Sequence, residues 1–155
     1  MVVEFLNPIA NRIGGFLIEI GLPVRAGAVP DKTFLPGIHV SNGVLIVDEA
    51  RLTYPGDLLH EAGHLAVTPA ALRTSVDGDA GENGGEEMAA IAWSYAAALH
   101  LNLAPEVVFH AAGYRGGSRS MIENFSAGRY IGVPFLKWIG LTGDNYPAMT
   151  RWLRD

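Results

Sequence analysis

Residues 58–64 read LLHEAGH and contain two histidines four positions apart, with a glutamate directly after the first. On a helix this spacing puts both imidazoles on one face, one turn apart, where they can bind a single metal ion. Glu61 then projects beside the ion and can accept a proton from a metal-bound water. His60 and His64 are therefore predicted metal ligands, and Glu61 a predicted general base. The alternative is a helix with two hydrogen-bonded core histidines.

A catalytic zinc also needs a third protein ligand, and the absence of cysteine leaves a carboxylate or another histidine to supply it. Glu86 and Glu87 begin an alanine-rich run, far enough after His64 for one helix to end and a second to run alongside. We prefer Glu87, because the residues on its helical face are small or apolar and allow close packing on the first helix. Glu86 stays open as the alternative ligand, and the acid that binds no metal would favour a helix N-terminus.

Two helices must position these residues. Leu58 to about Val67 is predicted to be an apolar helix that Pro69 ends, with Thr53 available as a capping residue. The run from Glu86 to Leu101, EEMAAIAWSYAAALHL, is the strongest helix prediction in the chain. Between the two helices, residues 77–85 (DGDAGENGG) form an acidic loop, which we interpret as an ordinary connector.

The rest of the chain predicts a small sheet and shorter helices. Residues 9–20 have helical spacing, and residues 38–40 and 44–47 flank a Ser-Asn-Gly turn that is typical of a hairpin. Pro105 to Gly113 predicts a helix containing His110, and residues 118–155 predict two or three short helices. The expected fold is one α+β domain over residues 1–155, mainly α, with a small antiparallel sheet.

The segments LLHEAGHLAV and EEMAAIAWSYAAALHL resemble the zincin metallopeptidases, particularly the gluzincin branch, in which HExxH on one helix is completed by a Glu on a second. They also resemble the compact ImmA/IrrE-type metallopeptidases. The resemblance covers roughly residues 44–101 and implies one Zn²⁺ per chain. It also implies a strand that runs antiparallel to the substrate above the metal, for which residues 44–47 are the candidate. HEAGH is similar, too, to the motif of membrane-anchored ATP-dependent zinc proteases, whose third ligand is an Asp, so Asp77 and Asp79 are weaker candidate ligands.

The resemblance further implies peptide-bond hydrolysis, with Glu61 taking a proton from the metal-activated water and passing it to the leaving amine. Such sites usually add a donor that stabilises the tetrahedral oxyanion. Residues of a suitable type are His110, Tyr114, Arg115 and Tyr130. We rank His110 first, because Tyr114 follows it by four positions. His39 and His100 are weaker candidates for this donor. The alternative for His110 is an ordinary core or surface histidine.

The charge pattern limits the classes of binding partner that we expect. The net charge of −5 comes from 16 acidic and 11 basic residues that are scattered along the chain, so nucleic acid and anionic lipid are not expected. The N-terminus does not read as a secretory signal and no stretch is apolar enough to span a membrane, so we expect a cytoplasmic protein. We expect a peptide or protein substrate. The rival hypotheses are a regulatory protein that keeps a zincin scaffold and acts through a protein partner, and a hydrolase of a non-peptide amide.

Overall fold

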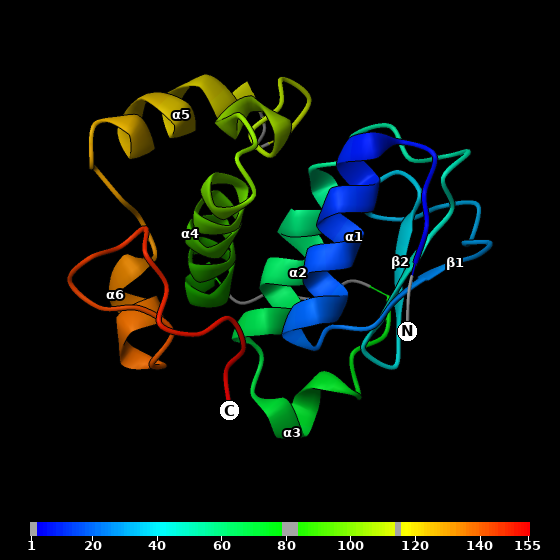
Figure 1. Ribbon diagram of the computed structural model, residues 1–155, viewed down its shortest axis with the longest axis horizontal. Helices are drawn as coiled ribbons and strands as arrows, with labels where there is room; N and C mark the ends of the chain where they lie inside the picture. The colour runs from blue at the N-terminus through cyan, green and yellow to red at the C-terminus, as the bar shows by residue number, and fades with distance from the viewer. Residues whose placement is uncertain (1–2, 79–83, 114–115) are drawn as a thin grey trace.

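The computed structural model describes residues 3–78, 84–113 and 116–155 (Figure 1). Its helices are α1 (Pro8–Ile20), α2 (Asp57–Val67), α3 (Ala70–Arg73), α4 (Gly84–His100), α5 (Ser118–Ser126) and α6 (Val133–Trp138), with a 3₁₀ turn, η1 (Pro105–Val107). Its strands are β1 (Val24–Ala26), β2 (Ile38–Ser41) and β3 (Val44–Val47). The predicted fold class, a mainly helical α+β domain, is confirmed.

Helix α2 lies between α1 and α4, and α6 covers α4 on its other side (Figure 1). All 11 residues of α2 are buried. A helix that is enclosed on every side can be apolar on all its faces. The few polar residues of α2 are therefore conspicuous among its apolar neighbours in the sequence. No helix in the part of the chain that the structure describes is long and apolar enough to cross a membrane.

The sheet has the order β1-β3-β2, with β2 antiparallel and β1 parallel to β3. The predicted hairpin is present, and its two turn residues, Asn42 and Gly43, have φ values of 48° and 77°. Two positive φ values define the tight turn that Asn-Gly favours between antiparallel strands. The prediction of a wholly antiparallel sheet is wrong, because β1 joins it in parallel. Only one of the three β1 residues is buried, so the strand leaves no alternating pattern in the sequence.

The place of Val44–Val47 corrects a second expectation. This strand, β3, is central and pairs with β1 on one edge and β2 on the other, so its backbone cannot also pair with an extended substrate. The free edges of the sheet belong to β1 and β2. At Val40, the outer edge of β2 forms an antiparallel bridge with Gly78.

The helix predicted from Pro105 to Gly113 is also absent. Only the η1 turn forms, and His110 follows it in irregular backbone. Two valines and a phenylalanine come before His110, and such residues favour a helix less than the alanines of α4 do. Val108 and Phe109 are buried, and the Phe109 ring stacks on Tyr95 of α4.

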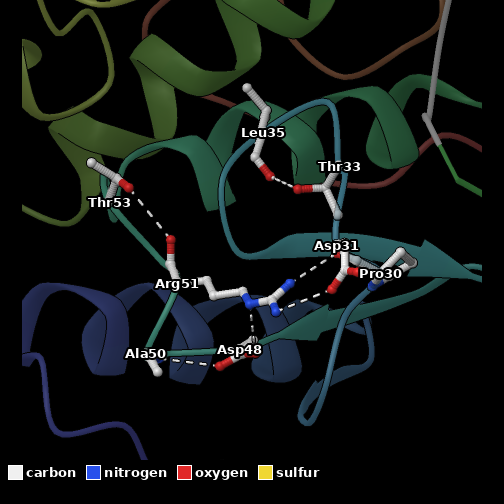
Figure 2. A network of polar contacts seen from close by, with 8 residues as sticks. All are labelled: Pro30, Asp31, Thr33, Leu35, Asp48, Ala50, Arg51 and Thr53. Carbon is white, nitrogen blue, oxygen red and sulfur yellow. Dashed lines mark hydrogen bonds and ion pairs between the residues drawn. The ribbon is translucent and has the colours of Figure 1, made fainter.

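The connection from β3 to α2 is shaped by Arg51 (Figure 2). Its guanidinium lies 3.3 Å from Asp31 Oδ1, donates to the Pro30 carbonyl at 3.3 Å, and lies 3.8 Å from Asp48 Oδ2. These contacts join the loop between β1 and β2, which contains Pro30 and Asp31, to the segment that leads into α2. Thr53 does not cap α2, since its hydroxyl donates to the Arg51 carbonyl and the N-cap position is Gly56.

Candidate metal centre

Three side chains from two helices converge at one point beside α2. The Nε2 atom of His64 lies 2.7 Å from Glu87 Oε2, and the Nε2 atom of His60 lies 3.4 Å from Glu87 Oε1. One ligand atom from each residue lies within 4.8 Å of the other two. His60 and His64 come from α2, and Glu87 from the first turn of α4.

The donor set and its spacing fit a metal ion. Donor atoms around tetrahedral zinc lie about 3.3 Å apart, because Zn–N and Zn–O bonds are about 2.0–2.1 Å long. The histidine–Glu87 separations of 2.7 and 3.4 Å, which run to the two different oxygens of Glu87, are close to that value, and one donor atom from each residue lies within 4.8 Å of the others. Two imidazoles and a carboxylate leave the fourth position for water or substrate, as in catalytic rather than structural zinc sites.

Gly63 allows α4 to come close enough for Glu87 to reach the histidines. A Cβ atom at Gly63 would lie 2.8 Å from the carbonyl oxygen of Ala90, so any side chain there would force the helices apart. Ser94, one turn further along α4, places its hydroxyl 2.7 Å from the Ala90 carbonyl and 3.2 Å from that of Leu59 in α2. Small residues on both helices therefore set the distance between the ligands.

The three ligands differ in their access to solvent. The side chains of His60 and His64 are 10% and 3% exposed, whereas that of Glu87 is 40% exposed. The hydrogen bond with His64 lowers the pKa of Glu87, and this effect outweighs the opposing effect of burial. Glu87 is therefore ionised at neutral pH and available to a cation, and the site opens to solvent on the Glu87 side.

Glu61 is 3% exposed and follows His60 directly on α2. On a helix, residues three apart are neighbours, so Glu61 lies on the same side of α2 as His64. Glu61 is buried, and it is not one of the three residues whose ligand atoms converge. Its role as a general base stays a prediction from the sequence.

The other acids named from the sequence are placed differently. Among the described residues, Glu86 is not part of the metal cluster, although it is adjacent to Glu87. The carboxylate of Asp77 accepts a hydrogen bond from the backbone of Asn42 at 2.8 Å and is likewise outside the cluster. Asp79 lies outside the described residues.

His110 pairs with an acid that the sequence analysis missed. Its Nε2 atom lies 2.6 Å from Oδ1 of Asp57, the first residue of α2, and its ring stacks on Tyr54. Burial raises the pKa of Asp57, against the lowering effect of His110. Asp57 lies one turn before His60 and Glu61 on the same helix. The one sequence signal for Asp57 is its place three residues before His60, the first residue of the HExxH motif.

The remaining candidates pack elsewhere or are not described. Tyr130 contacts the rings of Phe125 and Tyr146, and the Tyr146 hydroxyl donates to the Ala92 carbonyl. His39 is half-buried on β2, and the His100 ring contacts Phe16 and Trp152. Tyr114 and Arg115 lie outside the described residues.

Comparisons of the chain with family models, with curated proteins and with solved structures found no match. What is known of the centre therefore comes from its own geometry. Two histidines and a glutamate, held by two closely packed helices, form a site that could hold a metal ion.

Proposed function

We propose that this chain is a zinc-dependent metallopeptidase. The observation that carries the proposal is the convergence of His60, His64 and Glu87, and Glu61, which directly follows His60 on α2, is buried. Nitrogen and carboxylate donors without cysteine suit zinc, and three protein ligands leave room for a reacting molecule. A purely structural metal would have no use for a second, buried carboxylate directly after one of its ligands.

The two histidines and Glu87 would hold the ion, and Glu61 would move the proton. Bound zinc lowers the pKa of a coordinated water and polarises a substrate carbonyl. Glu61 would take up the proton of the attacking water and deliver it to the leaving amine. Its burial on α2 would keep bulk water from competing for this proton.

His110 keeps its proposed role as the donor to the tetrahedral oxyanion, under one condition. Its Nε2 atom is engaged with Asp57, and its Nδ1 atom is buried. The ring must therefore exchange its contact with Asp57 for the substrate oxygen when a peptide binds. Replacing His110 by Ala should then lower kcat while leaving the zinc content unchanged.

Metal binding is tested with a pair of adjacent variants. Purified wild type should contain about one zinc per chain by elemental analysis, as a single three-ligand centre requires. Glu87→Gln should lose most of this zinc, whereas Glu86→Gln should keep it, because Glu87 rather than Glu86 belongs to the cluster of described residues that could hold a metal. A wild type that takes up no zinc, or equal zinc in both variants, would contradict the proposed centre.

Hydrolysis is tested separately from metal binding. Glu61→Gln should keep the zinc and lose cleavage of a mixed peptide library, read by mass spectrometry. Glu123→Gln, which changes an exposed surface acid on α5, is the control and should cleave as wild type does. If the zinc-loaded wild type cleaves no peptide, the regulatory protein with a zincin scaffold becomes the better interpretation.

The cytoplasmic location stays a prediction from the sequence.

A further inference from the structure

The C-terminal end of α2 is held by hydrogen bonds from outside the helix. An α-helix leaves its last four carbonyl groups without partners of its own, and in α2 the first of these four belongs to the metal ligand His64. Each of these four carbonyl oxygens accepts a hydrogen bond. Thr68 Oγ1 donates to His64 at 2.7 Å, and Arg73 Nε donates to Leu65 at 2.9 Å. Arg154 donates twice, from its backbone N–H to Ala66 at 2.9 Å and from Nη1 to Val67 at 3.0 Å. The last turn of α2 is therefore closed by three residues that lie outside it.

The two arginines are themselves fixed in place. Arg73 also donates to the carbonyls of Thr68 at 3.2 Å and Arg154 at 2.5 Å, so one guanidinium joins the helix end to the C-terminal segment. The Arg154 guanidinium lies 5.8 Å from the ring centroids of both Phe135 and Trp138 of α6. A positive charge at the C-terminus of a helix also interacts favourably with its dipole.

The same segment reaches the other ligand helix. The indole Nε1 atom of Trp93, in α4, donates to the carbonyl of Trp152 at 2.9 Å, and the two rings meet edge to face. Trp93 is fully buried. Residues 152–154 are therefore bonded to α4, which carries Glu87, and to α2, which carries both histidines. They lie close to the C-terminus in Figure 1, where the chain runs beside both helices.

We infer that Arg154 and Thr68 are positioning residues for the metal ligand His64, with residues 152–154 acting as a brace between the two ligand helices. This inference rests on the proposed metal centre. Helix ends open more readily than helix centres, and His64 lies in the last turn of α2. If that turn opened, the imidazole of His64 would move relative to His60 and Glu87. A closed turn keeps the three donors in place before an ion arrives, which strengthens binding.

The first test replaces Arg154 and uses cobalt as the probe. The apparent Kd for Co²⁺ is measured by competition with a chelator, and the visible spectrum is recorded at saturating Co²⁺. Arg154→Met should raise the Kd about tenfold, as loss of supporting contacts does at other metal sites, and should alter the Co²⁺ spectrum. Arg154→Lys should recover part of the affinity, because a lysine can still donate to the Val67 carbonyl. Arg151→Met is the control, since Arg151 contacts Asp155 and the Gly140 carbonyl rather than α2.

A second pair of variants keeps the inference testable if Arg154→Met does not fold. Thr68→Val removes the hydroxyl that bonds the His64 carbonyl, with almost no change in shape. Thr142→Val is its match, because Thr142 is also 7% exposed and its hydroxyl bonds Ala148 at 2.8 Å, in a different part of the fold. Thr68→Val should weaken Co²⁺ binding about threefold or more, and Thr142→Val should leave it unchanged.

The outcomes separate the inference from the proposed function. A wild type that binds no Co²⁺ overturns the metal centre itself. A wild type that binds, with folded Arg154→Met and Thr68→Val variants that match its Kd and spectrum, overturns the positioning role alone. Urea unfolding of the metal-free proteins identifies a merely structural role, in which stability falls while the Kd and the spectrum stay the same.

Discussion

The Nε2 atom of His110 lies 2.6 Å from the Oδ1 atom of Asp57, although 53 residues separate them in the chain. Both side chains are mostly buried, at 13% and 6% exposure. Asp57 Oδ2 and His110 Nδ1 have no hydrogen-bond partner within the described part of the chain. Gly56 makes the contact possible, because a Cβ there would overlap the Val107 carbonyl and keep the segment that leads to His110 away from α2.

The Asp57–His110 pair should show strong energetic coupling. Asp57→Ala and His110→Ala should each lower the free energy of unfolding by about 3 kcal/mol, because each leaves a buried polar partner unpaired. The double variant should be about 2 kcal/mol more stable than the sum of the single effects predicts. Urea unfolding of the four proteins measures this coupling. Additive effects would show that the two side chains act independently.

Gly63 should be intolerant of a side chain. Gly63→Ala places a Cβ 2.8 Å from the Ala90 carbonyl, which must push α4 away and carry Glu87 from the histidines. We expect a loss of about 2 kcal/mol in stability and weaker zinc binding, measured by urea unfolding and metal competition. Gly15→Ala is the control, since a Cβ there meets nothing within 4 Å on the exposed side of α1. It should stabilise the protein by about 0.5–1 kcal/mol. Equal effects of both variants would contradict the close approach of α2 and α4.

Gly132 and Gly128 separate steric overlap from backbone strain. Both have positive φ, 76° and 78°, so an alanine at either position should cost about 1 kcal/mol. Only at Gly132 would a Cβ overlap the Met88 carbonyl, in the turn of α4 that carries Glu87. Gly132→Ala should therefore lose at least about 2 kcal/mol more than Gly128→Ala in thermal or urea unfolding. Similar losses would mean that α6 can shift on α4 without strain.

The metal-free protein should show a stability contribution from Glu87 that depends on pH. The folded state lowers the pKa of Glu87 below 4.5, so the folded protein binds this proton less tightly than the unfolded chain does. The contribution is therefore fully present above about pH 4.5 and is lost as the pH falls through the lowered pKa. The gap in unfolding free energy between wild type and Glu87→Gln should stay constant from about pH 7 to about pH 4.5 and shrink as the pH falls further, measured in urea with a chelator present. A gap that stays constant as the pH falls well below about 4.5 would show that the ionised carboxylate contributes nothing specific.

The sequence predicted α2 and α4 because both signals are local. The HExxH spacing and the alanine-rich run each lie within one helix, and the preference for Glu87 over Glu86 relied on the small residues of its face. The structure places Ala90 and Ser94 of that face against α2, and Glu87 against both histidines.

The parts that the sequence did not predict depend on contacts between distant segments. Nothing in the local pattern around His110 indicates Asp57, and nothing around Arg154 indicates the end of α2. The helix expected at residues 105–113 fails because burial of Val108 and Phe109 decides the backbone there, rather than the proline and glycine at its ends. Strand β1 is only three residues long, and its parallel partner decides its place in the sheet.

The unequal exposure of the three ligands determines how an ion would enter and leave. His64 is 3% exposed and lies in a helix that is braced at its end, whereas Glu87 is 40% exposed in the first turn of α4. An ion arriving from solvent meets the carboxylate first and the imidazole of His64 last, and departure follows the reverse order. A chelator that strips the metal would therefore reach it from the side of the first turn of α4, and His64 would be the ligand least open to solvent.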